Sequence, residues 1–180
     1  MNRFLRLGVI ALGMATVPAF SQTNPATITT SIKIINPILF TPATTLNFGT
    51  VAASSNGTAN TITMNAVASA RSIAGGGNGS LIADGANNPT SGSATITSEG
   101  GFALNLTVSA LTSGAAFLTL HNLTVSFNGA AQVAFPVATF TPGAGTPVST
   151  ALTFGGQMDV ASGATPGTHP GSFVLTGTYN

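Results

Sequence analysis

Residues 102–110, FALNLTVSA, carry a large apolar side chain at every second position. These side chains belong to Phe102, Leu104, Leu106 and Val108, and smaller side chains stand between them. Because successive side chains of a strand point to opposite faces, all four would share one face. The pattern predicts a β-strand with one face in a hydrophobic core.

Short runs of this kind recur along the chain, and Gly and Pro residues separate them. Thr is abundant, and its branched Cβ fits a pleated sheet. No segment combines helical spacing of apolar residues with a polar face. The other predicted strands cover residues 27–35, 45–51, 61–68, 93–97, 133–140, 148–154, 157–160 and 172–179. Many short strands between turn residues predict an all-β protein folded as a β-sandwich.

Residues 115–127 change phase in the middle of the run. Apolar residues up to Leu120 share one face of a strand, and those from Leu123 onward share the opposite face, so a single regular strand would leave half of them in water. A two-residue turn at His121 and Asn122 would place them all on one face, and Asn accepts the left-handed conformation of such turns. We therefore interpret His121 as a turn residue rather than a metal ligand, since no other ligand stands at a suitable spacing nearby.

Charged residues make up 4% of the chain, whereas 43% of the residues are hydrophobic. The side chains considered as acids, bases or metal ligands are Asp84, Glu99, Asp159, His121 and His169. They fall in no recognisable nucleophile or metal motif, so we expect no catalytic, cofactor or metal site, and a secreted hydrolase is the least favoured class. Nucleic acid is not an expected partner either, because the few basic residues form no stripe.

Residues 1–21 have the features of a signal peptide. A short basic start precedes an apolar run over residues 7–17, and Ala19 and Ser21 are the small residues that a signal peptidase reads. Cleavage is expected before Gln22, which predicts an exported protein. The apolar run is too short to span a membrane, since a spanning helix needs about 20 apolar residues. No membrane span is predicted for the mature chain, and with no Cys it has no disulfide.

The mature chain begins with an arm, which we assign to residues 22–36, followed by one β-sandwich domain over residues 37–180. Within the arm, the predicted strand 27–35 alternates. Its apolar stripe consists of Ile28, Thr30, Ile32 and Ile34. On the residues alone, this strand is equally an intrachain edge strand or a strand given to a neighbour.

The C-terminal residues form a second informative pattern, in which a Pro-Gly turn leads into residues 172–179. This segment places Phe173, Leu175 and Tyr179 on one face, and Tyr179 is the penultimate residue. The pattern predicts a terminal strand that is buried on one face.

Several short motifs of the chain are similar to those of a known family. They are LNFGT at residues 46–50, RS at 71–72, GGQMDV at 155–160 and the terminal segment 167–180. The chain resembles the bacterial exported domain-of-unknown-function family 4402, and with it the subunits of chaperone–usher fimbriae and the spore-coat-U-like subunits. The likeness covers nearly the whole mature chain. It departs from many such pilins in lacking a Cys pair and in having His169 where an aromatic residue is expected.

This resemblance implies an incomplete immunoglobulin-like, or pilin-like, sandwich that a strand from the neighbouring subunit completes. The donated strand would carry Ile28, Thr30, Ile32 and Ile34 into that neighbour. The implied function is that of a structural subunit of an extracellular fimbria on a Gram-negative cell surface, reached through the periplasm. The implied partners are identical subunits in a head-to-tail filament, a periplasmic chaperone and an outer-membrane usher.

One alternative from another class remains open at this point. A monomeric exported binding or adhesion module would complete its own sandwich, with residues 27–35 as an ordinary first strand. The two hypotheses differ in whether this segment pairs within its own chain.

Overall fold

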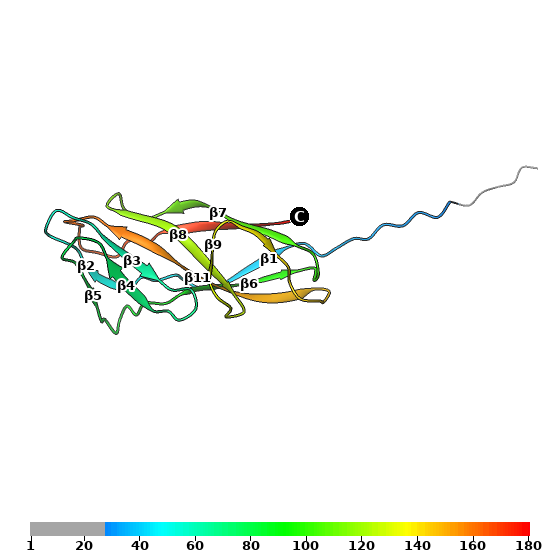
Figure 1. Cartoon of the computed structure of the whole chain (residues 1–180), viewed down its shortest axis with the longest axis horizontal. Coiled ribbons are helices and arrows are strands. Elements are labelled where there is room, and N and C mark those ends of the chain that lie inside the picture. Colours follow the sequence, from blue (N-terminus) through cyan, green and yellow to red (C-terminus); the bar gives the residue numbers. More distant parts are fainter. Residues whose placement is uncertain (1–27) are drawn as a thin grey trace, which may run out of the picture. The chain divides into compact units, whose positions relative to one another are not determined.

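The computed structural model describes residues 28–180, and within them the only regular secondary structure is β-strand (Figure 1). The predicted signal peptide, its cleavage site and residue 27 lie outside the described residues. The chain divides into two units, residues 1–33 and 34–180, and all described strands belong to the second unit. The strands are β1 (Leu39–Thr44), β2 (Thr50–Ala52), β3 (Asn60–Met64), β4 (Arg71–Ala74), β5 (Ser80–Ile82), β6 (Gly92–Ser98), β7 (Leu104–Thr112), β8 (Leu118–Phe127), β9 (Val133–Ala134), β10 (Val137–Phe140), β11 (Val148–Val160) and β12 (Ser172–Tyr179). The predicted all-β class is confirmed.

The larger sheet is built around β11, the longest strand. Residues 148–154 of β11 pair with β6, and residues 156–160 pair with β3. Along its opposite edge β11 pairs with β8. The sheet then extends from β6 to β1, from β3 to β4, and from β8 to β9. All of these pairings are antiparallel.

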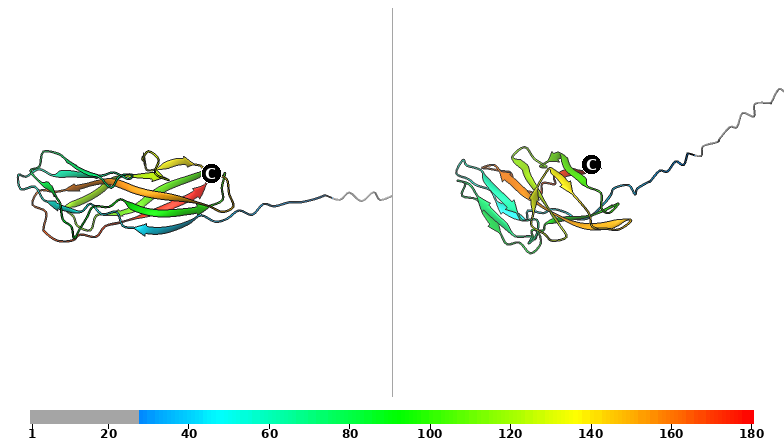
Figure 2. Two further views of the ribbon diagram at one scale, coloured as in Figure 1. Left: turned by 90° about the horizontal axis from the view of Figure 1, so that it is seen from below. Right: turned by 45° about the vertical axis from the view of Figure 1, so that its right-hand side comes forward.

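The smaller sheet has the order β10–β7–β12 and is also antiparallel. The strands of both sheets run along the long direction of the domain (Figure 2). Buried side chains from the two sheets meet in one core, which confirms the sandwich. The core consists of Ala94, Ile96, Leu104, Leu106, Val125, Val137, Leu152 and Phe154. Of the four alternating residues in segment 102–110, Leu104 and Leu106 are fully buried and Val108 is half-buried. Phe102 lies before the strand, because β7 covers residues 104–112 rather than the predicted 102–110.

A third, two-stranded sheet pairs β2 with β5, and Arg71 attaches it to β4. One guanidinium nitrogen, Nη1, donates to the carbonyls of Phe48 and Thr50 at 2.7 and 2.9 Å. The second nitrogen, Nη2, donates to the carbonyl of Ile82. A fork of several donors suits this task, because it satisfies acceptors from two strands at once. Neither β4 nor β5 is predicted from the sequence.

The predicted turn at His121 and Asn122 is wrong, since both residues lie inside the continuous strand β8. Opposite Gly156 of β11, the strand β8 places two residues, Asn122 and Leu123. This is a β-bulge, in which one extra residue shifts the alternation without reversing the chain. Asn122 has a φ of 48°, the left-handed conformation that Asn accepts more readily than most residues. The phase change is therefore real, but its cause is a bulge.

The N-terminal strands also differ from the prediction. Residues 28–38 form no strand, so the expected strand over 27–35 is absent from its described part. Of the expected strand over 45–51, only the last two residues lie in a strand, the short β2. The strand β1 ends before this segment begins. Between β1 and β2, Asn47 makes a single bridge to Thr90. Pro42 lies within β1, which is an edge strand, where a missing N–H is tolerated.

Three further segments have different bounds from those predicted. The segment 61–68 stops at Met64, after which the chain turns. The segment 133–140 is divided into β9 and β10 at Pro136, which has no N–H for a ladder. The segments 148–154 and 157–160 form one strand, β11, which runs through Gly155 and Gly156. The terminal strand β12 matches its predicted bounds.

Candidate functional site

The described part of the arm exposes its apolar stripe. The side chains of Ile28, Ile32 and Ile34 are 85%, 86% and 84% exposed, and Thr30 is exposed as well. Almost all of the apolar side-chain area of these three isoleucines is therefore available for burial against another surface. The stripe is an apolar surface that stays exposed to solvent in this structure.

The first strand of the sandwich is an open edge. Within the described residues, β1 pairs with β6 along one side and with no strand along the other. Phe40 points inward and packs against the core, while Leu39 is 59% exposed. The outer backbone groups of β1 therefore present an unpaired row of donors and acceptors.

The last strand is an open edge in the smaller sheet. In the described structure β12 pairs with β7 alone. Its side chains alternate between exposed and half-buried along its whole length. Phe173, Leu175 and Tyr179 are the half-buried ones and pack against the core, so the predicted alternation is confirmed. These three side chains cover the core from the inner face of β12.

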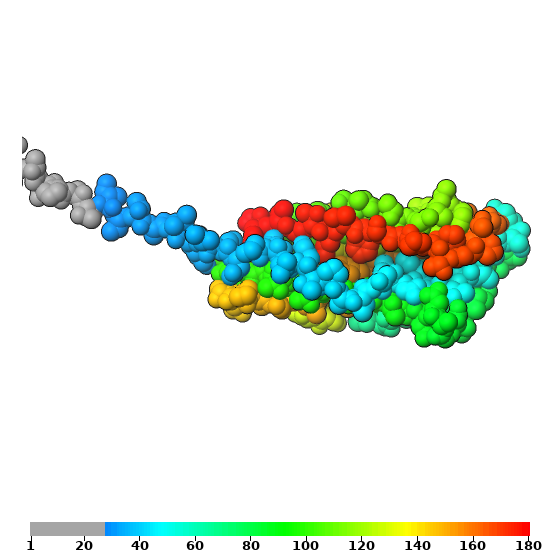
Figure 3. Space-filling model, turned by 180° about the vertical axis from the view of Figure 1, so that it is seen from behind, coloured from blue at the N-terminus to red at the C-terminus, as the bar shows by residue number. Residues whose placement is uncertain are grey.

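These two open edges lie side by side on one surface of the domain. In Figure 3 the strand β12 (red) runs beside the segment that contains β1 (blue to cyan). They are close at Gly177, where an added Cβ would lie 3.0 Å from the Phe40 ring and 3.3 Å from Ile38. No ladder hydrogen bonds join them, because β1 and β12 belong to different sheets. We call this boundary the seam: β1 and β12 each have an edge there that pairs with no described strand, while the side chains of Ile38 and Phe40 lie against Gly177.

A group of polar residues ties the base of the arm to both edges. The Tyr179 hydroxyl donates to the carbonyl of Asn36 and accepts from the backbone N–H of Glu99, each at 2.8 Å. The Asn36 amide donates to the Glu99 carboxylate at 2.8 Å. Glu99 is 3% exposed, although it directly follows β6. We call Asn36, Glu99 and Tyr179 the arm anchor. From the sequence, Glu99 is only a candidate acid, because no local pattern indicates its contacts with Asn36 and Tyr179.

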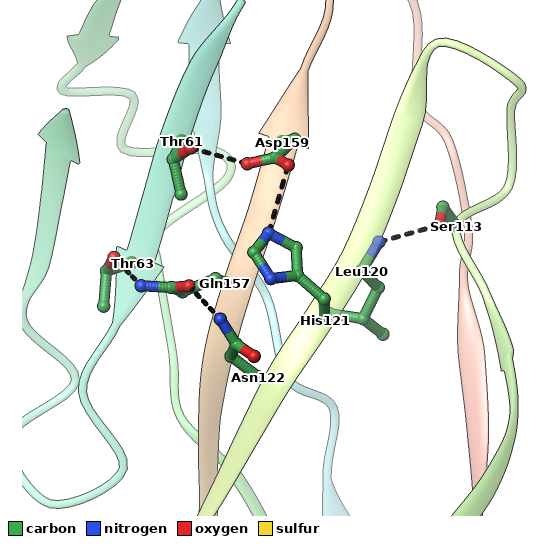
Figure 4. Close-up of polar contacts among 8 residues, drawn as sticks. All are labelled: Thr61, Thr63, Ser113, Leu120, His121, Asn122, Gln157 and Asp159. Carbon is green, nitrogen blue, oxygen red and sulfur yellow. Dashed lines mark hydrogen bonds and ion pairs between the residues drawn. The ribbon is translucent and has the colours of Figure 1, made fainter. Parts of the chain in front are cut away.

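The histidine and aspartate singled out in the sequence lie together on the outer face of the larger sheet (Figure 4). His121 Nε2 lies 3.1 Å from Asp159 Oδ2, and Thr61 donates to Asp159 Oδ1 at 2.6 Å. The hydrogen bond from Thr61 has the largest effect on the pKa of Asp159 and lowers it. Partial burial opposes this, and the contact with His121 lowers the pKa further. Because the Thr61 hydroxyl bonds to the carboxylate and not to the imidazole, His121 is not placed to activate it.

Other ionisable residues are spread over the fold. His169 lies in the loop before β12, where its ring contacts Phe117 edge to face with the ring centroids 4.9 Å apart. Asp84 accepts hydrogen bonds from Thr50 and from the N–H of Ala86, and these lower its pKa. Among residues 28–180, no three His, Cys, Asp or Glu side chains lie close enough together to hold a metal ion. The same residues contain no helix long and apolar enough to cross a membrane.

Comparison with known families agrees with the sequence motifs. The model of the family described as a domain of unknown function, DUF4402, matches residues 38–179. The chain belongs to this family. The match begins just before β1 and ends at the last residue of β12, so the two open edges are the first and last strands of the DUF4402 domain. No curated protein and no solved structure matches the chain.

Proposed function

We propose that this protein is a structural subunit of an extracellular fimbria and that it polymerises by donating its N-terminal arm to a neighbouring copy. The seam between β1 and β12 receives the arm. The observation that carries the proposal is the combination of an exposed isoleucine stripe with two neighbouring strand edges that pair with no described strand. Export by a signal peptide, a periplasmic chaperone and an outer-membrane usher belong to the same proposal. An immunoglobulin-like arrangement of the completed sandwich does too.

The lengths of the donor and the acceptor agree. Residues 28–35 cover the same length of chain as β12, which has 8 residues. As an added strand, the arm would pair its backbone with β12 on one side and β1 on the other. Main-chain hydrogen bonds of this kind supply affinity, and alternate side chains entering the interior fix the register.

The stripe also supplies enough apolar area to matter. Burying an isoleucine side chain contributes about 1.5–3 kcal/mol, and the three in the arm are almost fully exposed beforehand. Ordering the arm opposes this gain by about 1–2 kcal/mol for each residue fixed. Side-chain burial alone therefore does not hold the arm, and the backbone ladder to both edges is required. This is why an acceptor with two open edges is needed.

Head-to-tail donation explains how one kind of subunit makes a filament. The arm and the seam are different surfaces of the same chain, so the contact between two copies is heterologous. Each copy that receives an arm still has its own arm to give. Such contacts continue into an open filament unless their rotation happens to close a ring.

A matched pair of arm variants tests the proposal. Ile32→Asp places a carboxylate on the inserted face, where an unpaired charge in an apolar site costs several kcal/mol. Ser31→Asp adds the same charge at the adjacent position, which points to the opposite face of an inserted strand. Filament yield by electron microscopy should fall to background for Ile32→Asp and stay near the wild-type value for Ser31→Asp.

Thermal unfolding of the monomeric fraction separates the two hypotheses. If the arm belongs to a neighbour, Ile32→Asp leaves the melting temperature of the monomer unchanged, because Ile32 is outside its core. A self-completed adhesion module predicts the reverse. A large fall in the melting temperature of the Ile32→Asp monomer, with assembly retained by the folded fraction, would refute donation by this arm.

A further inference from the structure

We propose that the arm anchor prevents the arm from entering the seam of its own chain, so that the partner of each seam is a second copy of this chain. This inference rests on the proposed function and concerns the choice of partner. Its basis is the position of Asn36, the residue where the arm joins the domain, between Glu99 and Tyr179.

The backbone and side chain of Asn36 are held from three directions. Its carbonyl accepts from Tyr179 at 2.8 Å, its side-chain amide donates to Glu99 at 2.8 Å, and its backbone nitrogen lies 3.5 Å from the same carboxylate oxygen. The Tyr179 hydroxyl also accepts from the N–H of Glu99, so it fixes the positions of both partners. The conformation at residue 36 is set by the ends of two different strands, β6 and β12.

Insertion of the arm into its own seam requires a reversal of the chain at this point. The arm precedes Asn36, and β1 begins at Leu39. To lie beside β1 as an antiparallel neighbour, residues 28–35 would have to fold back through a tight turn with Asn36 and Pro37 at its centre. That turn would withdraw Asn36 from Tyr179 and would leave the buried Glu99 carboxylate with fewer donors, which is unfavourable.

The local sequence opposes the same reversal independently of the hydrogen bonds. Proline disfavours the α conformation in the residue before it, so Pro37 keeps Asn36 extended. The commonest turn needs that α conformation at its first central residue and disfavours proline at the second. The sequence Ile35-Asn36-Pro37 therefore continues the chain in an extended direction. The arm of another copy reaches the seam without any turn.

The consequence is a subunit with an unused arm and an unused seam of its own. A chain that filled its own seam would be a stable monomer and would end a filament. The anchor removes this competing state, which leaves a neighbouring copy as the available donor.

The test measures whether a loosened turn lets the arm occupy its own seam. The probe is a fluorescent peptide of residues 28–36, and the readout is its binding by the monomeric fraction, followed by anisotropy. Four full-length proteins are compared: wild type, the double variant Asn36→Gly/Pro37→Gly, Ile32→Asp, and the combination of all three changes. The double variant permits the turn, and Ile32→Asp disables the chain's own arm.

The expected result is a loss of peptide binding that depends on an intact arm. If the arm fills its own seam nine times in ten, the apparent affinity of the double variant for the peptide falls about tenfold. The combination should bind the peptide as well as Ile32→Asp does, which also shows that the domain is folded. Filament yield of the double variant should fall in parallel.

The opposite results are equally clear. Wild-type affinity and wild-type filament yield in the double variant would overturn the inference while leaving the proposed function intact. Absence of peptide binding by every protein, the wild type included, would overturn both. If the double variant does not fold, Tyr179→Phe with Pro37→Gly replaces it, because this pair removes the hydrogen bond from Tyr179 to Asn36 and the restraint from Pro37. Unaltered peptide binding by this pair, with and without Ile32→Asp, would then refute the inference.

Discussion

Replacing Arg71 by methionine should destabilise the domain far more than an ordinary surface substitution. The change keeps an unbranched, flexible side chain about as long as the arginine stem and removes the guanidinium. Three backbone carbonyls lose their donor, those of Phe48, Thr50 and Ile82. The methionine can still cover the apolar surface that the arginine stem covers, so the effect isolates the hydrogen bonds.

The magnitude follows from the number and setting of these bonds. A hydrogen bond to a charged group contributes about 1.5–3 kcal/mol when both partners are shielded, and water can replace the donor at an exposed carbonyl. The bonds to Phe48 and Thr50 are partly buried, whereas the bond to Ile82 is exposed. We therefore expect Arg71→Met to lose about 2–4 kcal/mol of unfolding free energy, most of it from the two partly buried carbonyls.

Equilibrium unfolding of the monomeric protein in urea measures this loss. The midpoint should fall, and the slope should be unchanged if the unfolding stays two-state. Arg71→Lys is the informative control, because lysine keeps the charge but has no planar fork. It should recover less than half of the lost stability. A loss below about 0.5 kcal/mol for Arg71→Met would place it among ordinary surface changes and would refute the attachment of β2 and β5 through this side chain.

Three further changes test other parts of the structure. Gly155→Ala should lower the unfolding midpoint strongly, because its Cβ would lie 2.3 Å from a backbone carbonyl of β3 that cannot swing away; a midpoint within error of wild type would contradict this packing. The pKa of Asp159 is lowered below 3.8 in the folded state, so its contribution to stability is present above that value and is lost as the pH falls through the folded pKa. Asp159→Asn should therefore flatten the acid side of the stability curve, and an unchanged acid slope would argue against the Asp159 contacts. His121→Ala with His169→Ala should cost about 1 kcal/mol, mainly from the lost ring contact of His169, and leave filament yield unchanged; loss of assembly would assign the histidines a role that the structure does not suggest.

Alternation along single strands predicted much of the sandwich. Leu104 and Leu106 are buried where the pattern of residues 102–110 requires, and β12 alternates along its predicted length. These strands bury one face against the core and expose the other face, so apolar and polar residues alternate in their sequences. Their identification needs no knowledge of the partner strand.

Features that depend on a partner strand were beyond the sequence pattern. A phase change such as that between Leu120 and Leu123 has two causes, a turn or one extra residue, and both suit an Asn in the left-handed conformation. The residue that accommodates the bulge is Gly156, where an added Cβ would lie 2.8 Å from the Leu123 side chain. It stands on β11, far along the chain from the bulge. A local sequence pattern does not indicate which distant residue will pair with it across the sheet.

The candidate interface was predicted in the same uneven way. The isoleucine stripe and the inner face of β12 follow from local alternation, and the exposures of Ile28 and Ile32 agree with an unused stripe. The strand β1 was misplaced, because Pro42 reads as a break and edge strands are where proline is tolerated. Because β1 was not predicted, the sequence indicates only the open edge of β12, whereas the proposed seam is formed by the edges of both strands.

The few charges of the domain explain how so neutral a chain holds its parts together. Arg71 joins the two-stranded sheet to β4, Glu99 joins β6 to the base of the arm, and Asp159 joins β11 to β3 through Thr61. Each stands where several donors or acceptors must be met at one point, which a charged fork or carboxylate does better than a hydroxyl. Hydroxyl and amide side chains make up most of the remaining polar surface. In the filament that we propose, copies arranged head to tail would meet with little charge repulsion, and the isoleucine stripe and the backbone edges would set the register of contact.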